Sequence, residues 1–194
     1  GLMHIATLPI FTYLVAAERN LIASGLLAEH LSAPRDIVVV TRNDLDTLTP
    51  GQTPLKFARF DPLSSDGWLT LRIVLFGNGV TEIEESAIVE VDSYQEAIDT
   101  VSNGDADVLA MPRLIWEDHD RQENLRIYTQ IEAIDSDGIY FIPDIDSDVK
   151  TRISNALLDR SVAGRLGFLA ESHGWGSLRL ADPQEFDRFR LIVE

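Results

Sequence analysis

The feature that most constrains the fold is an unbroken run of four β-branched residues, Ile37-Val38-Val39-Val40. Side chains of a strand alternate between the two faces of its sheet, so a run that is apolar at every position needs cover on both faces. Such cover is typical of a parallel or mixed sheet with helices on either side. Strand-like and helix-like patterns alternate along much of the chain, and we therefore predict an α/β fold.

Local patterns predict the other elements. Short apolar runs that end at turn residues predict strands over residues 4–8, 56–60, 87–91, 107–111, 126–131 and 138–142. Apolar residues at helical spacing predict helices over residues 10–15, 68–76 and 94–103, the last of them ended by Gly104. Beyond residue 142 we expect only helices, with starts at Ser147, Ser161 and Asp182.

Charge and composition limit the partners of the chain. Its 194 residues, 45% of them apolar, are enough for one domain or two small lobes with a real core. A formal charge of −16 would repel a phosphate backbone, so we expect no nucleic-acid partner. The apolar stretch from Ile5 to Ala17 is too short and interrupted to cross a bilayer, so we expect no membrane insertion. The absence of cysteine excludes disulfides and thiolate chemistry.

Hydroxyl and carboxylate side chains gather where the predicted strand 56–60 turns into the next helix. Ser64-Ser65-Asp66-Gly67 stand directly before the apolar helix pattern that begins at Trp68. The first N–H groups of a helix and its dipole attract anions, so this helix start is a candidate binding site. The simpler alternative is an ordinary helix cap that binds nothing.

Four stretches resemble the phosphate/phosphonate family of ABC-transporter substrate-binding proteins. They are Arg35-Asp36-Ile37-Val38-Val39-Val40, the segment from Phe57 to Leu69, Ser93-Tyr94-Gln95-Glu96-Ala97-Ile98, and Gly104-Asp105-Ala106-Asp107-Val108. The similarity begins at Ile5-Ala6-Thr7-Leu8-Pro9 and extends to the C-terminal helices, so it covers nearly the whole chain.

The resemblance implies a type II periplasmic binding protein fold, with two lobes, mixed sheets and a hinge. Lobe I would comprise residues 1–36 and 133–194, and lobe II residues 37–132. The ligand would lie in the cleft between the lobes, and its binding would involve no catalysis, cofactor or metal. The implied partners are a small polar or anionic solute and either an ABC permease or a sensor module, in the periplasm or outside the cell. The implied ligand-binding residues are Tyr13, Ser64, Ser65, Asp66, Gly67, Tyr94 and Asp107.

Two residues depart from the family pattern and suggest a changed ligand. Asp66 stands where the serine-rich turn usually carries a third hydroxyl, and Tyr94 follows Ser93 where the family tends to have histidine. A carboxylate opposes a doubly charged phosphonate unless it is protonated or paired. Asp66 would therefore recognise an ammonium or hydroxyl group of a zwitterionic or neutral solute, or it would simply cap the helix.

The resemblance also places a strand, a long helix and another strand ahead of the segment with which this chain starts. Because these have no counterpart here, we expect an N-terminally shortened first lobe.

Two of the implied binding residues have ordinary structural alternatives. Tyr13 sits on an apolar helix, where an aromatic is commonly part of the core, and Asp107 stands at a strand start, where aspartate commonly caps a turn.

Neither metal sites nor enzyme motifs are evident. The segment from Trp116 to Asp120 is better explained as a solvated acidic helix end, and Asp144, Asp146 and Asp148 lack the glycine and glutamate of a calcium loop. No nucleophile elbow, phosphate loop or dinucleotide fingerprint occurs. Two alternatives to a binding protein remain. One is a small-molecule enzyme on the same fold, as in menaquinone precursor synthesis, and the other is a degenerate sensor or interaction module.

Overall fold

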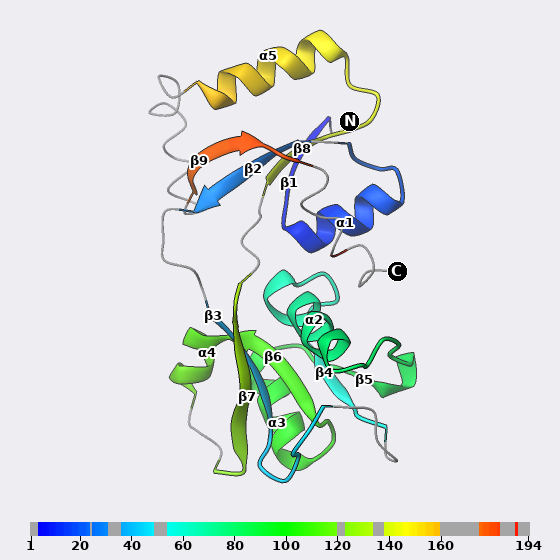
Figure 1. The fold of residues 1–194 in the computed structure, drawn as a ribbon, viewed down its shortest axis with the longest axis vertical. Coiled ribbons are helices and arrows are strands. Elements are labelled where there is room, and N and C mark those ends of the chain that lie inside the picture. The colour runs from blue at the N-terminus through cyan, green and yellow to red at the C-terminus, as the bar shows by residue number, and fades with distance from the viewer. Residues whose placement is uncertain are drawn as a thin grey trace. The chain divides into compact units, whose positions relative to one another are not determined.

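The chain divides into two compact units, each with its own sheet (Figure 1). One unit comprises Gly1–Ala33 and Asp135–Glu194, and the other comprises Pro34–Ile134, so the second is inserted into the first. A computed structural model describes residues 4–23, 25–30, 36–48, 54–119, 123–133, 138–159, 175–182 and 189.

The discontinuous unit contains a four-stranded sheet in the order β1-β8-β2-β9, with antiparallel pairing in its described ladders. Strand β8 lies between β1 and β2 and pairs with both. Gly25 of β2 is opposite Tyr140 of β8, and a Cβ atom on Gly25 would lie 2.1 Å from the Ile139 carbonyl oxygen, so the close pairing requires glycine. The described elements are β1 (Ile5–Leu8), α1 (Ile10–Glu18), β2 (Gly25–His30), β8 (Gly138–Phe141), α5 (Ser147–Leu158) and β9 (Trp175–Leu180).

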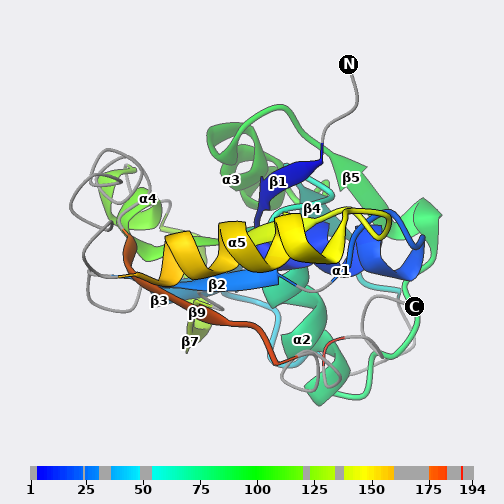
Figure 2. The same cartoon turned by 90° about the horizontal axis from the view of Figure 1, so that it is seen from above.

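Helices α1 and α5 cover opposite faces of this sheet (Figures 1 and 2). Tyr13 of α1 stacks on Tyr140 with ring centroids 4.2 Å apart, whereas Leu157 of α5 packs against Ile139. Ile139 and Tyr140 are neighbours in β8, so their side chains point to opposite faces.

The continuous unit contains a five-stranded mixed sheet in the order β5-β4-β6-β3-β7. Strand β4 is parallel to both β5 and β6, whereas β3 is antiparallel to β6 and β7. The described elements are β3 (Asp36–Arg42), β4 (Phe57–Arg59), the π-helical turn η1 (Ser65–Leu69), α2 (Thr70–Gly77), the 3₁₀ turn η2 (Glu85–Ala87), β5 (Ile88–Glu90), α3 (Tyr94–Asn103), β6 (Val108–Pro112), α4 (Arg113–Asp118) and β7 (Leu125–Glu132).

The β-branched run is buried on both faces, as its sequence predicts. Val38 and Val40 belong to an apolar core that also includes Ile98 of α3 and Trp116 of α4. The alternating residues of the same run, such as Val39, point to the other face and are equally buried. The turn η1 and helix α2 pack against β6, the central strand of this sheet.

Two strands differ from the expectations. Residues 25–30 form β2, for which no strand was predicted, and residues 175–180 form β9 where only helices were expected. In β9 the pattern Ser177-Leu178-Arg179-Leu180 alternates with the period of a strand, and pairing with β2 holds it in the sheet. The helix start at Ser147 is confirmed, with Asp146 as its cap. The start expected at Ser161, and the helix expected after Asp182, fall on residues outside those described, apart from Phe189.

Candidate functional site

The candidate site is the helix start that follows β4. The backbone N–H of Leu63 donates to the Asp61 carboxylate at 2.8 Å, and the N–H of Ser64 donates to the Asp61 carbonyl at 3.1 Å, which turns the chain. Ser64 then caps the helix, because its Oγ accepts a hydrogen bond from the Gly67 N–H at 2.9 Å. The serine cluster therefore forms the cap that its residue types favour.

The first turn of this helix is wider than an α-helical turn. The Leu69 N–H donates to the Ser64 carbonyl at 3.0 Å, five residues back, and the Thr70 hydroxyl donates to the Ser65 carbonyl at 2.9 Å. Thr70 is fully buried, so its hydroxyl fixes the turn from inside the unit. Single π-type turns of this kind are frequent at functional sites.

Gly67 leaves room at this turn that a side chain would fill. A Cβ atom on Gly67 would lie 3.2 Å from the Ser64 Oγ and 3.4 Å from the carbonyl oxygen of Ala110 in β6. The first distance is shorter than ordinary van der Waals contact. Glycine therefore lets the helix start, its capping hydroxyl and β6 approach one another closely.

A small pocket opens beside the cap. Its volume of about 10 Å³ is enough for a single water molecule. The residues that line it come from β4 and the turn after it, from η1 and α2, and from α3 and β6: Ala58, Arg59, Phe60, Asp61, Ser64, Gly67, Trp68, Leu71, Tyr94 and Ala110.

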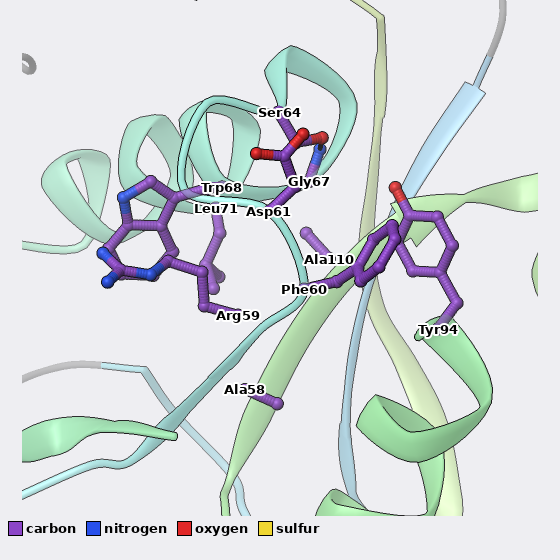
Figure 3. A pocket seen from close by; sticks show the side chains of 10 residues that line it. All are labelled: Ala58, Arg59, Phe60, Asp61, Ser64, Gly67, Trp68, Leu71, Tyr94 and Ala110. Atoms are coloured by element: carbon purple, nitrogen blue, oxygen red, sulfur yellow. Dashed lines mark hydrogen bonds between the residues drawn. The ribbon is translucent and has the colours of Figure 1, made fainter. Parts of the chain in front are cut away.

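Figure 3 shows two groups of side chains at this pocket. Arg59 lies with Trp68 on one side, and Phe60 lies with Tyr94 on the other. Ser64 stands above and between the two groups. The pocket thus combines three aromatic rings with the hydroxyls of Ser64 and Tyr94, a carboxylate and a guanidinium.

Tyr94 reaches the pocket from the start of α3, which Ser93 caps by accepting a hydrogen bond from the Glu96 N–H at 3.1 Å. Its ring lies 4.9 Å from that of Phe60 at an interplanar angle of 54°, and 41% of the Phe60 surface is exposed. An exposed aromatic ring beside a polar cap offers a ligand an apolar contact.

Two carboxylates act on Tyr94. Burial is the largest cause that raises the pKa of its hydroxyl, and the negative charges of Asp66 and Asp61 raise it further, whereas a hydrogen bond with Ser64 lowers it. Ser64, Asp61 and Asp66 therefore all act on the Tyr94 hydroxyl.

Arg59 is the cation at the pocket, and it is already engaged. Its guanidinium lies 5.0 Å from the centroid of the Trp68 ring, and its Nε donates to both carboxylate oxygens of Glu90 at 3.1 and 3.2 Å. A second nitrogen bonds to Glu90 and lies 3.4 Å from Glu85. The bond to Glu90 is the main reason that the pKa of Arg59 is raised.

The structure brings Ser64, Gly67 and Tyr94 together at this pocket, with Ser65 and Asp66 in the same turn. Asp107 is not among the lining residues. Its carboxylate lies 3.1 Å from Arg42 and accepts the backbone N–H of Lys56 at 2.8 Å, just before β6 begins. These contacts match the structural alternative for Asp107.

Tyr13 belongs to the other unit. Its side chain is 5% exposed and stacks on Tyr140, as expected for a core residue.

Sequence patterns did not single out Arg59, Phe60, Asp61 or Trp68, although all four lie in the segment from Phe57 to Leu69 that carries the family resemblance. An aromatic and an acid directly after a strand, ahead of the serines, are the signal that would have found Phe60 and Asp61.

A wider groove of about 600 Å³ lies elsewhere in the continuous unit, between residues 54–57 and 79–87. It borders the amino-terminal ends of the parallel strands β4 and β5 and contains none of the predicted site residues.

Within the described part of the chain, His, Asp and Glu residues form no group that could hold a metal ion. The acidic segment after Trp116 ends α4, in agreement with the expected helix end; Asp120 lies outside the described residues. None of the described helices has the length and hydropathy needed to cross a membrane.

Comparison with known proteins identifies the family. The model for "ABC transporter, phosphonate, periplasmic substrate-binding protein" matches residues 1–188. The chain belongs to this family. The description of this family is that of a transporter's substrate-binding component and not of an enzyme. No curated protein matches the sequence.

Solved structures confirm the fold of this phosphonate-family protein. XAC2383 from Xanthomonas citri, solved with chloride and with ATP, is 16% identical with a TM-score of 0.69, over 98% of this chain and 76% of that chain. PA3383 of Pseudomonas aeruginosa, a binding component of an ABC phosphonate transporter, is 13% identical with a TM-score of 0.63, over 98% and 67%. PhnD1 from Prochlorococcus marinus, solved with methylphosphonate, is 14% identical with a TM-score of 0.58, over 98% and 77%. The expected α/β periplasmic binding protein fold is therefore confirmed.

Proposed function

We propose that this phosphonate-family protein captures a small zwitterion for an ABC permease, with the polar end of the solute held at the Ser64–Gly67 turn. A hydroxyl offers one donor and two acceptor sites. Ser64 can therefore accept from the Gly67 N–H and from the neutral Tyr94 hydroxyl and still donate its own proton to a solute. The helix dipole favours an anionic group at this position. The exposed face of Phe60 would contact the apolar or cationic part of the solute.

The observation that supports a zwitterion most strongly is the pair of carboxylates beside Tyr94. Asp61 and Asp66 both raise the pKa of that hydroxyl, and the guanidinium of Arg59 is bound by Glu90. Near a protein surface, two like charges about 4 Å apart repel by about 4 kcal/mol. A solute that brings its own positive charge turns this repulsion into attraction, whereas a dianion does not.

The second candidate ligand is a phosphonate or phosphate, which the family match over residues 1–188 favours. Binding of a dianion here would have to overcome the negative charges of Asp61 and Asp66. The part that Tyr13 and Asp107 play in ligand binding stays a prediction under either candidate.

The test is a calorimetric titration of the whole chain with methylphosphonate, inorganic phosphate, 2-aminoethylphosphonate and glycine betaine. We expect a zwitterion to bind most tightly, and Asp66→Ser to weaken that binding while improving the binding of methylphosphonate. Ser64→Ala should weaken every ligand that binds at the turn. Asp146→Ala is the matched control, because it removes a helix cap from the other unit and leaves the pocket intact.

Each other outcome has a definite meaning. Tightest binding of methylphosphonate, lost in Ser64→Ala and unaffected by Asp66→Ser, would contradict the zwitterion and support the second candidate. Consumption of a bound solute would support an enzyme on this fold. No binding of any solute in the panel would contradict the capture function and support an interaction module.

A further inference from the structure

Arg59 connects the strands of the continuous unit to the helix turn at the pocket. It is the last residue of β4 and stands directly opposite Glu90, the last residue of the parallel strand β5. This register places both side chains at neighbouring positions on one face of the sheet. The two-pronged contact of the Arg59 Nε and Nη2 with the Glu90 carboxylate follows from that placement.

The guanidinium contacts Trp68 as well as Glu90. Its central carbon lies 5.0 Å from the centroid of the indole ring, close enough for a cation–π interaction. Trp68 is 6% exposed and belongs to η1, the turn whose first residues follow the Ser64 cap and include Gly67. The side chain of Arg59 is 12% exposed, so this contact is largely shielded from solvent.

We infer that Arg59 is a positioning residue for the binding turn: held by Glu90, it fixes Trp68 and thereby the placement of the Ser64 hydroxyl and the Gly67 N–H. The inference rests on the proposed function for its effect on affinity. Glu90 lines no part of the pocket, yet the orientation of Arg59 depends on it. We call the series of contacts from Glu90 through Arg59 to Trp68 the clamp.

The clamp predicts effects that a direct ligand contact would not produce. Lysine keeps the charge of Arg59 but lacks the planar, two-pronged donor geometry that both pairs with a carboxylate and stacks on a ring. Glutamine at position 90 removes a charge at a residue that does not line the pocket. If Arg59 acts through Trp68, then Arg59→Lys and Glu90→Gln should disturb the same turn in the same direction.

The test combines a ligand-free measurement with an affinity. In the ligand-free chain, Arg59→Lys and Glu90→Gln should both move the amide NMR signal of Gly67. Calorimetry with whichever probe binds the native chain should show Kd raised about tenfold in each variant, equivalent to about 1.4 kcal/mol. Arg113→Lys and Glu117→Gln are matched controls, because this exposed pair, 2.7 Å apart on α4, lies outside the pocket, and they should change neither quantity.

Two results would overturn the inference. One is a Gly67 signal that Glu90→Gln moves no more than Glu117→Gln does. The other is a large loss of affinity in Arg59→Lys with none in Glu90→Gln, which would make Arg59 a direct ligand contact. If no probe binds the native chain, the proposed function fails, and the Gly67 amide signal alone then decides whether the clamp sets the turn.

Discussion

Replacement of Gly67 by alanine tests how tightly the Ser64–Gly67 turn is packed. Alanine is favoured over glycine inside a helix by about 0.5 to 1 kcal/mol, because glycine loses more backbone freedom on folding. At Gly77, the end of the helix that continues from this turn, an added methyl group would meet nothing within 4 Å, so Gly77→Ala should deliver that stabilisation. It is the matched control.

At Gly67 the same gain meets a steric cost. The added Cβ would stand 3.2 Å from the Ser64 Oγ and 3.4 Å from the Ala110 carbonyl oxygen, which belongs to the backbone of a central strand. Ser64 must therefore give way, and its 2.9 Å cap to the Gly67 N–H lengthens. Loss of a cap costs about 1 kcal/mol. The weakened cap and the close contacts of the added methyl group both destabilise Gly67→Ala. We therefore expect this variant to be less stable than Gly77→Ala by about 1 to 2 kcal/mol.

Urea unfolding followed by tryptophan fluorescence measures this difference, since Trp68 and Trp116 both lie in the unit that carries the mutations. Gly67→Ala should also raise the Kd of the solute about tenfold or more, since a lost hydrogen bond to a charged group costs about 1.5 to 3 kcal/mol. Gly77→Ala should leave the Kd unchanged. Equal stability of the two variants, together with unchanged binding by Gly67→Ala, would refute the close packing of the turn and its role in binding.

Three further predictions concern charged groups. Asp66→Asn removes a negative charge beside Tyr94 and should lower the raised pKa of that hydroxyl toward its ordinary 10.0, as ultraviolet titration would show; no change would mean that Asp66 does not act on this hydroxyl. Asp107→Asn weakens the pair with Arg42 and should lower the free energy of unfolding in urea by about 1 to 3 kcal/mol. The solute Kd should stay unchanged, and a raised Kd would make Asp107 a binding residue. The bond to Arg59 lowers the pKa of Glu90 below 4.5, so this carboxylate stabilises the fold above that pH and the contribution is lost as the pH falls through its folded pKa. Acid unfolding of Glu90→Gln should therefore lack this loss, and an unchanged acid transition would contradict the pairing.

Local patterns predicted the parts of this fold that depend on neighbours in sequence. The apolar run from Ile37 to Val40 predicted burial on both faces of the sheet, and all four residues are buried. Gly104, at a φ of +84°, ends α3 at the position that the helical spacing predicted. Strand β2 could not be predicted in this way. Its sequence, Gly-Leu-Leu-Ala-Glu-His, contains good helix formers and no alternation, and its extended form depends on pairing with β8 and β9 from the other end of the chain.

The candidate site likewise combines a local feature that the sequence predicted with long-range contacts that it did not. The hydroxyl cluster and the following glycine indicated the Ser64 cap, because a cap is a local structure. Nothing local indicates that Arg59 would stack on Trp68 and pair with Glu90, since that arrangement needs the parallel register of two strands. The pairing of Asp107 with Arg42, 65 residues away, is equally invisible to sequence patterns.

The strand order of the discontinuous unit has a consequence for synthesis on the ribosome. Strands β1 and β2 pair with β8 and not with each other, so in the described sheet they have no common partner until residues 138–141 have emerged. The continuous unit is complete once residue 134 has been made. Because domains fold as units while the chain grows, we expect the later-starting unit to mature first. Proteolysis of ribosome-arrested chains of increasing length should show residues 34–134 protected before β1 and β2, and simultaneous protection would contradict this order.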